Sequence, residues 1–259
     1  MFADFLAFFG FAKADIFYVL ALAAFAGGLV RGFTGFGFAM VFVPLATIAV
    51  GPVMAAALIW LIDFPFAWIL AASSWRRVAW REIAPLLTAS ILFLPLGVWL
   101  LTHSDPVTAR WCIAVAILLG VTALATGWRY RGSPGLPLSF GVGGAAGIAS
   151  GMAQLGGMPI AIFWLAAQKN DPRQTRDNLN GFFCLLPTIA GIAYWLSGVL
   201  TITALKMAIP LAVPYGLGLA IGARAFPFAS EQTFRRVAYF VIFMAAVVAL
   251  PAIDPVLGR

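Results

Sequence analysis

The sequence contains few charged residues. Asp, Glu, Lys and Arg make up 10% of its 259 residues, whereas hydrophobic residues make up 63%. A soluble domain carries about 25% charged residues and roughly 45–50% apolar ones. Because a water-soluble fold of this size needs a polar surface, the composition excludes an ordinary soluble enzyme, and its hydrophobicity excludes an intrinsically disordered chain. We therefore expect an integral membrane protein.

Residues that bind metals or act as nucleophiles are scarce as well. His103 is the only histidine, and the only cysteines are Cys112 and Cys184, so the sequence has no ligand set with metal-site spacing. Both cysteines lie in apolar stretches, which predicts buried packing residues. No Gly-x-Ser-x-Gly, His-Glu-x-x-His or acidic pair occurs within the apolar runs, which disfavours an intramembrane enzyme. We predict no enzyme activity, no metal and no cofactor.

The net charge of +7 raises the question of nucleic-acid binding. The sequence has no basic run interleaved with exposed aromatic residues, the pattern typical of single-strand binding. We therefore predict no nucleic-acid partner and assign the cations to loops beside the membrane. The residues from Met1 to Asp4 lack the basic region of a cleavable signal peptide, so we expect none.

Long charge-free runs are the main feature that the sequence does have. Residues 32–62, 132–168 and 178–205, for example, contain no Asp, Glu, Lys or Arg. A helix needs about 20 apolar residues to cross a bilayer, and continuously apolar runs favour helices over the alternating strands of a barrel. The sequence thus predicts an all-α integral membrane protein with about ten transmembrane or re-entrant helices. We place them at about 16–30, 37–50, 53–73, 83–102, 107–127, 138–150, 156–168, 179–197, 201–223 and 233–251.

Lys and Arg concentrate in four of the predicted loops, and these four loops share one side in an alternating ten-helix arrangement. In chain order the loops carry Arg76, Arg77 and Arg81; Arg129 and Arg131; Lys169, Arg173 and Arg176; and Arg224, Arg235 and Arg236. Cytoplasmic loops of membrane proteins carry an excess of such residues. We therefore expect a multi-pass protein of the plasma membrane (the bacterial inner membrane) with these loops in the cytoplasm and both termini outside.

The chain also repeats itself. Residues 26–37 align with 145–156 at an offset of 119, and the segment from Pro85 to Gly97 aligns with the segment from Pro210 to Gly222 at an offset of 125. Chance matching in a Gly-rich sequence is the alternative explanation. We predict a first five-helix repeat over 1–128, a cytoplasmic linker over 129–137 and a second repeat over 138–259. Because each repeat holds an odd number of helices, the second lies inverted, as in many secondary transporters.

Two glycine-rich segments, here called the first tip (residues 27–37) and the second tip (residues 147–157), occupy equivalent places in the repeats. Each lies between apolar segments of only about 13–15 residues, which predicts a re-entrant hairpin or a broken helix. Helices that begin near Gly37 and Gly156 would direct free N–H groups and positive dipole ends inward, where an anion can bind. The predicted substrate-binding residues at the tips are Arg31, Gly32, Thr34, Gly35, Gly37, Gly151, Gln154, Gly156 and Gly157.

Close helix packing is the alternative role for these glycines, because Gly28-x-x-x-Gly32 and Gly147-x-x-x-Gly151 fit small-xxx-small faces. Two more polar residues belong to the predicted substrate site, Asn178 and Asn180, which enter the predicted helix 179–197. They face the cavity or simply cap that helix. Both alternatives stay open from the sequence.

Arg31 and Asp63 are two charges that the loops do not explain. Arg31 is an intramembrane cation that pairs with substrate if the first tip is re-entrant, and an anchor at the inner surface if its helix spans fully. Asp63 lies midway through a predicted helix, where an ionisable group is costly and indicates function. We predict that Asp63 carries the coupling proton; the alternative is a structural role, as an ion pair with Arg31 or as a protonated packing group.

These motifs resemble the TauE/SafE sulfite exporter family, also called the toluene sulfonate uptake permeases, over about residues 16–250. The resemblance rests on Gly28-x-x-x-Gly32-x-x-Gly35-x-Gly37 with Pro44, on Gly147-x-x-x-Gly151-x-x-x-x-Gly156-Gly157-x-Pro159, and on the Pro85–Gly97, Pro210–Gly222 and Phe234-Arg235-Arg236 segments. It implies transport of sulfite, sulfonates or related small anions. The second tip departs from the family pattern, because Met152-Ala153-Gln154 stands where many members are more Gly-rich.

Together these observations predict a secondary transporter for a small anion such as sulfite, an organosulfonate or a related small organic acid. The substrate binds between the two tips, and alternating access is coupled to a proton. Its expected partners are therefore the small anionic substrate, the lipid bilayer and the coupling proton. A passive anion channel is the main alternative.

Overall fold

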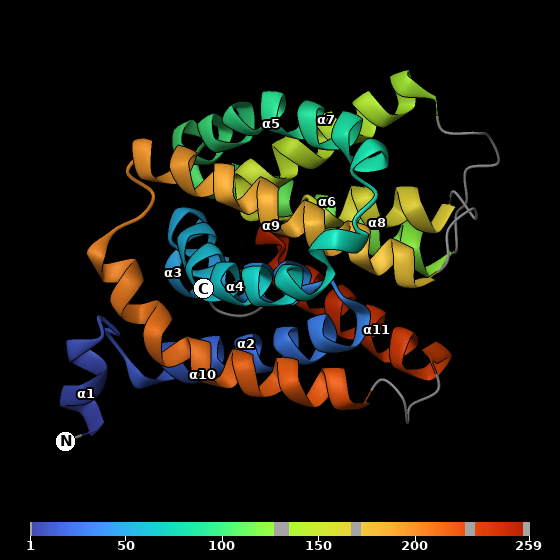
Figure 1. The fold of residues 1–259 in the computed structure, drawn as a ribbon. Helices are drawn as coiled ribbons and strands as arrows, with labels where there is room; N and C mark the ends of the chain where they lie inside the picture. The colour runs from blue at the N-terminus through green and yellow to red at the C-terminus, as the bar shows by residue number, and fades with distance from the viewer. Residues whose placement is uncertain (1, 127–134, 167–171, 226–230, 256–259) are drawn as a thin grey trace.

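The computed structural model describes residues 2–126, 135–166, 172–225 and 231–255 (Figure 1). Every regular element in these ranges is helical, which confirms the all-α class. The α-helices are α1 (Phe2–Phe8), α2 (Ala14–Thr34), α3 (Phe38–Val50), α4 (Pro52–Ser74), α5 (Trp80–His103), α6 (Pro106–Ala125), α7 (Leu136–Ala153), α8 (Gly157–Ala166), α9 (Pro172–Leu196), α10 (Ile202–Ala225) and α11 (Glu231–Ala249). Two 3₁₀ turns follow α4 and α11, η1 (Trp75–Arg77) and η2 (Pro251–Ile253).

The helices α2 to α11 overlap the ten predicted ranges one for one, and α1 was not predicted. By length and composition, seven helices in the described part of the chain can cross a membrane: α2, α4, α5, α6, α7, α9 and α10. The helices α3 and α8 are shorter, with 13 and 10 residues. The structure is therefore that of a multi-pass membrane protein.

The helices that lead into the two tips are longer than the sequence suggested. The expected segments of about 13–15 residues end at Val30 and Ser150, but α2 has 21 residues and α7 has 18. Both helices continue through their glycines because these glycines pack against neighbouring helices, which compensates for their poor helix propensity. Only the second helix of each pair is short.

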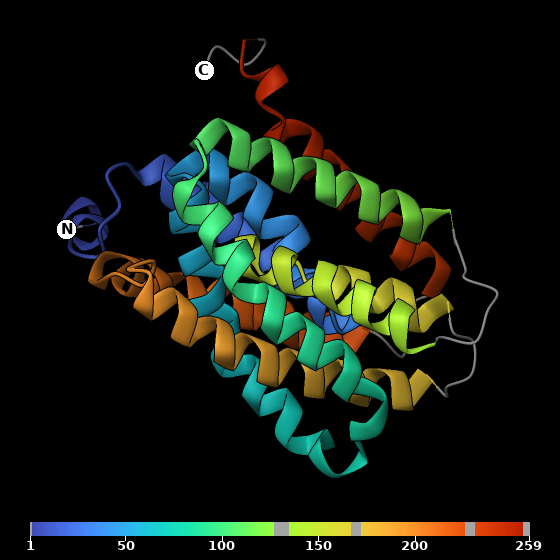
Figure 2. The ribbon, with the colours of Figure 1, turned by 90° about the horizontal axis from the view of Figure 1, so that it is seen from above.

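The closest helix pairs join the two halves of the chain. The helix α2 packs along α10 (Figure 1), and α7 packs along α5 (Figure 2). A Cβ atom at Gly28 or Gly32 would collide with the backbone of α10 at Tyr215 or Leu219. At the other pair, Gly147 and Gly151 meet the backbone of α5 at Ser90 and Leu94, and Gly222 and Gly97 meet Leu29 and Ile148. Only glycine allows backbones to approach so closely.

These contacts correspond to each other at the offsets that the sequence suggested. Gly28 and Gly147 differ by 119, and their partners Ser90 and Tyr215 differ by 125. The same offsets relate Gly32 and Leu219 to Gly151 and Leu94, and Leu29 and Gly222 to Ile148 and Gly97. The matched glycines of the sequence are therefore contact residues between the halves.

The helix α3 lies at the centre of the bundle. Its residues from Phe38 to Pro44 are all buried, and Phe42 and Val43 have no exposed surface. A helix that is hydrophobic on all sides is expected in such a position. The helices α2, α4 and α11 all pack against it.

The two cysteines differ in burial. Cys112 is exposed on α6, so the expectation that both cysteines are buried holds only for Cys184.

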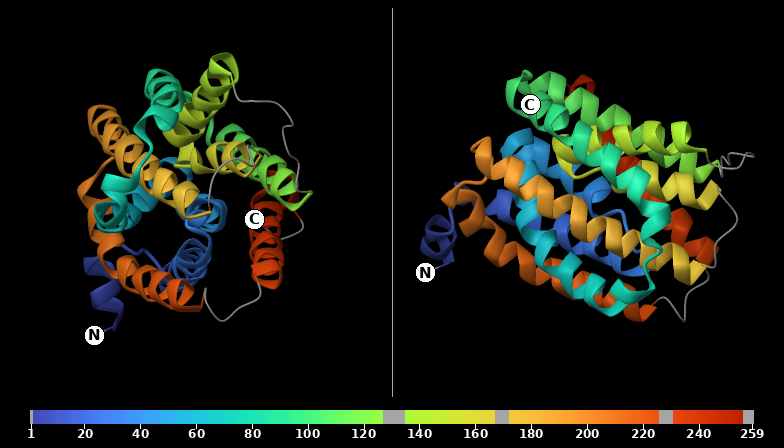
Figure 3. Two further views of the ribbon diagram at one scale, coloured as in Figure 1. Left: turned by 45° about the vertical axis from the view of Figure 1, so that its right-hand side comes forward. Right: turned by 45° about the horizontal axis from the view of Figure 1, so that its top comes forward.

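The beginnings of α5, α7, α9 and α11 gather at one end of the bundle with the ends of α6 and α10 (Figures 1 and 3). The four predicted cytoplasmic loops join these helix ends. Arg129, Arg131 and Lys169, together with the linker residues 129–134, lie outside the described residues. The assignment of this end to the cytoplasm stays a prediction.

Candidate anion site between the two helix tips

The first tip reverses the chain between α2 and α3. The helix α2 ends at Thr34, and Gly35 adopts a left-handed conformation, φ +83°, whose N–H bonds to the carbonyl of Arg31. Gly37 is also left-handed, φ +98°, and begins α3. The Thr34 hydroxyl bonds to backbone oxygens of Val30 and Phe36 at 2.8 and 2.6 Å. Two left-handed residues in three positions explain why the tip needs glycine.

The second tip reverses the chain through one left-handed residue, whereas Gly156, which aligns with Gly37, does not have a positive φ. The helix α7 ends at Ala153, and Gln154 is left-handed, with φ +56° and ψ +27°. Gln154 is the only non-glycine residue with positive φ among the described residues, and it aligns with Gly35 at the offset of 119. The left-handed conformation costs a residue with a side chain about 1–2 kcal/mol. Its Nε2 donates a 3.3 Å hydrogen bond to the Ser150 carbonyl.

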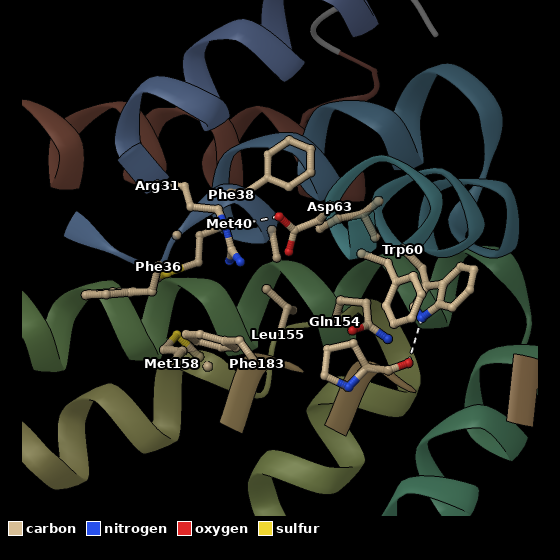
Figure 4. Close-up of a pocket in the computed structure, with 16 residues that line it drawn as sticks. Arg31, Phe36, Phe38, Met40, Trp60, Asp63, Gln154, Leu155, Met158 and Phe183 are labelled. Carbon is tan, nitrogen blue, oxygen red and sulfur yellow. Dashed lines mark hydrogen bonds and ion pairs between the residues drawn. The ribbon is translucent and has the colours of Figure 1, made fainter. Parts of the chain in front are cut away.

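A small cavity lies between the two tips (Figure 4). The first tip contributes Gly37 and the first turn of α3, and the second contributes Gln154 and the first turn of α8, while α4 and α9 close the sides. The lining residues include Arg31, Phe36, Trp60, Asp63, Leu155, Gly157, Met158 and Phe183. Its volume is about 40 Å³, and a water molecule needs roughly 10–15 Å³. The cavity therefore holds a few water molecules at most.

Arg31 reaches this cavity from the last turn of α2. Its residue is 5% exposed, and its Nε lies 3.0 Å from Oδ1 of Asp63 on α4. Nε makes no hydrogen bond within the described residues, so this contact is an ion pair. The terminal guanidinium nitrogens point away from Asp63 toward Phe183, whose ring centre lies 5.3 Å from Cζ (Figure 4). A buried cation that presents its outer donors to a cavity can bind an anion.

The burial of Arg31 bears on the two roles that the sequence left open for it, and both stay predictions. A surface anchor would keep its charged group in water, whereas the Arg31 side chain is only 6% exposed and paired with a residue in the middle of α4. The structure thus places Arg31 in the interior beside Asp63. The ion pair that was the alternative role for Asp63 is present as well.

Tyr215 on α10 is a functional candidate that sequence reasoning missed. Its hydroxyl donates a hydrogen bond to Oδ1 of Asp63, the same oxygen that faces Arg31. Its ring is buried against Phe38, 4.2 Å between ring centres. The available signal was the repeat, because Tyr215 aligns with the polar Ser90 at the offset of 125.

Other polar side chains support the walls of the cavity. Trp60 on α4 donates a 2.7 Å hydrogen bond from Nε1 to the carbonyl of Pro187 on α9. Tyr194, fully buried on α9, donates to the carbonyls of Ser150 and Gly151 at 3.2 and 3.0 Å. These bonds add a side-chain donor to two carbonyls in the last turn of α7, where the Ser150 carbonyl also accepts the N–H of Gln154. Sequence reasoning did not identify either residue.

Some of the predicted site residues lie outside the cavity lining. Gly32 and Gly151 face α10 and α5 in the helix contacts described above, and a Cβ at Gly156 would collide with Ser150. Gly35 forms the turn with open space around it, and the Thr34 hydroxyl is occupied within its own tip. The predicted residues that do line the cavity are Arg31, Gly37, Asp63, Gln154 and Gly157.

Asn178 and Asn180 lie in α9 and turn toward the junction of α4 and α5 instead of the cavity. Asn178 accepts a 2.8 Å hydrogen bond from the N–H of Ala79 and donates to Glu82 at 3.1 Å. Asn180 donates to the Ser74 hydroxyl at 3.0 Å. Since α9 begins at Pro172, neither asparagine caps it. Both residues tie the second half of the chain to the first.

An ion pair strengthens the same junction. Arg77 donates hydrogen bonds to both carboxylate oxygens of Asp177, at 2.7 and 3.3 Å. These bonds and the charge of Asp177 raise the pKa of Arg77 above its ordinary value. Because the Arg77 side chain is 61% exposed, solvent screens the pair and we expect little stabilisation from it.

The comparisons with known proteins agree with this membrane fold. Within the described residues, no group of three or more His, Cys, Asp or Glu side chains is arranged to hold a metal. The comparison with curated proteins gave no match, and neither did the comparison with solved structures. A family model described as sulfite exporter TauE/SafE matches residues 20–249, which include both tips and the helices around them. The chain therefore belongs to the TauE/SafE sulfite exporter family, a family of membrane transport proteins.

Proposed function

We propose that this protein is a secondary transporter that moves a small anion across the plasma membrane by proton-coupled alternating access. The substrate class is sulfite, an organosulfonate or a related small organic acid. The observation that carries the proposal is Arg31, which is 5% exposed and directs its terminal guanidinium nitrogens into the cavity between the tips. In the described ranges, the structure gives these nitrogens no hydrogen-bond acceptor, so an oxyanion would supply one.

The two helix beginnings add to this attraction. The first turns of α3 and α8 line the cavity from opposite tips. Each turn carries N–H groups without a partner inside its own helix, together with the positive end of a helix dipole. Gln154 adds an amide that can donate or accept a hydrogen bond. Arg31, Gly37, Gln154 and Gly157 are therefore the residues that we assign to the anion.

The size of the cavity supports alternating access. At about 40 Å³ the space is too small for an organic anion, so the two tips must separate to admit one. The reciprocal contacts of α2 with α10 and of α7 with α5 support an inverted repeat. In such a protein the two halves rock around a central site, which opens it to one side at a time. We assign proton coupling to Asp63, which lies beside the anion-binding cation.

Transport by reconstituted protein tests the proposal. Proteoliposomes with an imposed pH gradient should accumulate labelled sulfite or an organosulfonate above its outside concentration, and a protonophore should abolish the accumulation. A thermal-shift comparison of sulfite, sulfate, sulfonates and carboxylates would identify the preferred anion. Equilibration without accumulation would instead support the passive anion channel. The absence of any anion flux or stabilisation would contradict the proposed site.

Two glycine variants make the test specific for the tips. Gly37→Leu places a side chain on a left-handed residue at the cavity, where a Cβ would lie 2.9 Å from Val30 Cγ1. Gly51→Leu puts the same side chain on another glycine with positive φ, +81°, with no atom within 4 Å of its Cβ position. We expect Gly37→Leu to block transport while the protein stays in the membrane, and Gly51→Leu to retain transport. Normal uptake by Gly37→Leu would exclude the first tip from the site.

A further inference from the structure

Asp63 has three neighbours that determine what its carboxylate can do. Oδ1 accepts the hydrogen bond from Tyr215 and also faces Nε of Arg31 at 3.0 Å. The other carboxylate oxygen points into the cavity, toward Leu155 and Gln154 of the second tip (Figure 4). One oxygen is therefore held from two sides, and the other is open to the place where we expect the substrate.

No other titratable group faces this carboxylate within the described residues. The helix α2 contributes Arg31 and α10 contributes Tyr215. The helices α3 and α9 contribute Phe38 and Phe183, and the second tip contributes Gln154, none of which titrates. Arg31 and the hydroxyl of Tyr215 are therefore the charged and hydrogen-bonding neighbours of the Asp63 carboxylate.

We propose that Tyr215 is a positioning residue that holds Asp63 beside Arg31, so that Asp63 and the transported anion compete for one guanidinium and the bound anion brings one proton with it. This inference rests on the proposed transport function and adds the device that couples anion to proton. Tyr215 contacts the coupling carboxylate, and it lies outside the lining of the anion cavity.

The charges of the site explain the coupling. With the cavity empty of substrate, Arg31 and Asp63 neutralise each other. When a monovalent anion binds to Arg31, a second negative charge enters a water-poor interior, where an unpaired charge is costly. A proton from solution that binds the cavity-facing oxygen of Asp63 removes this excess. The bound state then again contains one cation and one anion, and the transported unit is an anion with a proton.

The hydroxyl of Tyr215 determines which oxygen of Asp63 receives the proton. A hydroxyl that donates to a carboxylate stabilises its ionised form, and here the bond occupies Oδ1. Protonation is thereby directed to the other oxygen, and the carboxyl group stays in place when Arg31 turns to the substrate. Without the hydroxyl, the carboxyl group would accept a proton more readily and before the anion arrives.

Proton uptake on anion binding is the first test, and it needs no variant. Isothermal titration of the purified protein with sulfite, in buffers of different ionisation enthalpy, should show about one proton taken up per anion at a pH where Asp63 is ionised. Asp63→Asn should still bind sulfite, with no proton uptake. If wild-type protein binds sulfite without proton uptake, the competition is wrong although the anion site stands. If it binds no anion tested, the proposed function fails and this inference fails with it.

The pH profile of transport tests Tyr215 itself. Tyr215→Phe keeps the ring that packs on Phe38 and Phe66 and removes only the hydroxyl. We expect its half-maximal pH to move upward by about one unit, because one unit corresponds to a modest hydrogen bond to a charged group. Tyr18→Phe, the same change on the exposed face of α2, should leave the profile of the wild type. An unchanged profile in folded Tyr215→Phe, judged by gel filtration, would overturn the role of Tyr215.

Discussion

The two tips turn at equivalent positions and differ in their chemistry. Both reverse the chain through a left-handed residue, Gly35 in one and Gln154 in the other. The position that carries Arg31 in the first tip carries Ser150 in the second, at the offset of 119. The neighbours Asp63 and Tyr215 also approach the first tip. Two tips that turn at equivalent positions can thus place a charged site on one side of the cavity and a neutral wall on the other.

The left-handed turn costs the two tips different amounts of backbone strain. Gly35 adopts this conformation without strain and has no atom near the place of a Cβ. Gln154 accepts the strain of the same conformation, and its amide lies at the cavity. A strained residue at such a place indicates a function that glycine cannot supply. We infer that the first tip holds the charge of the substrate and that the second distinguishes its shape.

Removing the cation of the first tip should have the largest effect. Arg31→Gln leaves Asp63 without its ionic partner in a buried site, and breaking such a pair costs about 3–5 kcal/mol. We expect this variant to lose transport and to unfold at a lower temperature in detergent. The double variant Arg31→Gln with Asp63→Asn should regain most of the stability and none of the transport.

The ion pair of Arg110 and Asp254 provides a matched control for that result. Arg110 lies on α6 and bonds to Asp254 at 2.8 Å, away from the cavity. Arg110→Gln with Asp254→Asn should retain transport. If the Arg31→Gln double variant also transported at the wild-type rate, the difference between the tips would have no functional meaning.

Replacing Gln154 in the turn of the second tip should raise the stability of the protein and lower its affinity for the anion. Gln154→Gly relieves the left-handed strain and should raise the free energy of unfolding by about 1 kcal/mol. It also removes the amide from the cavity, so we expect weaker anion binding. Chemical denaturation and thermal shift with added anion measure the two effects.

The matching change at the first tip should lower the stability without affecting anion binding. Gly35→Ala introduces about 1 kcal/mol of left-handed strain in open space and should leave anion affinity unchanged. A Gln154→Gly variant with normal affinity and selectivity among anions would show that the second tip serves only as a turn.

The smallest effect is expected for Thr34, whose equivalent in the second tip is Ala153. The Thr34 hydroxyl bonds only to the backbone of its own tip among the described residues. Thr34→Val should therefore lower the free energy of unfolding by less than about 1 kcal/mol and leave anion affinity nearly unchanged. A large loss of affinity would mean that this hydroxyl turns to the substrate when the tips separate.

Much of the fold could be predicted because the bilayer restricts it so strongly. A chain in lipid must satisfy its backbone groups within helices, so the charge-free runs predicted the positions of α2 to α11. The tips were predicted because left-handed turns such as Gly37 favour glycine. Helix ends were less predictable: Thr34 and Ala153 end their helices later than the glycines suggested, since packing outweighs helix propensity.

The candidate site could be predicted only in part. Arg31 and Asp63 were recognisable because a charge in an apolar run is costly wherever it lies. The sequence could not show that they pair with each other, or that Tyr215 joins them from a position 152 residues beyond Asp63. Asn178 was assigned to the cavity but lies at a structural junction. The sequence could not separate these two places, because a polar residue near the start of a helix fits either one.

The sequence by itself determined the class of protein, the helical segments and the glycine turns, because these depend on local composition and on the polarity of the solvent. Only the tertiary structure decided which glycines pack against neighbouring helices and which line the cavity. It also decided that Arg31, Asp63 and Tyr215 form one cluster. Side chains from three helices meet only when those helices pack, and the direction in which each points depends on close contacts that no single segment contains.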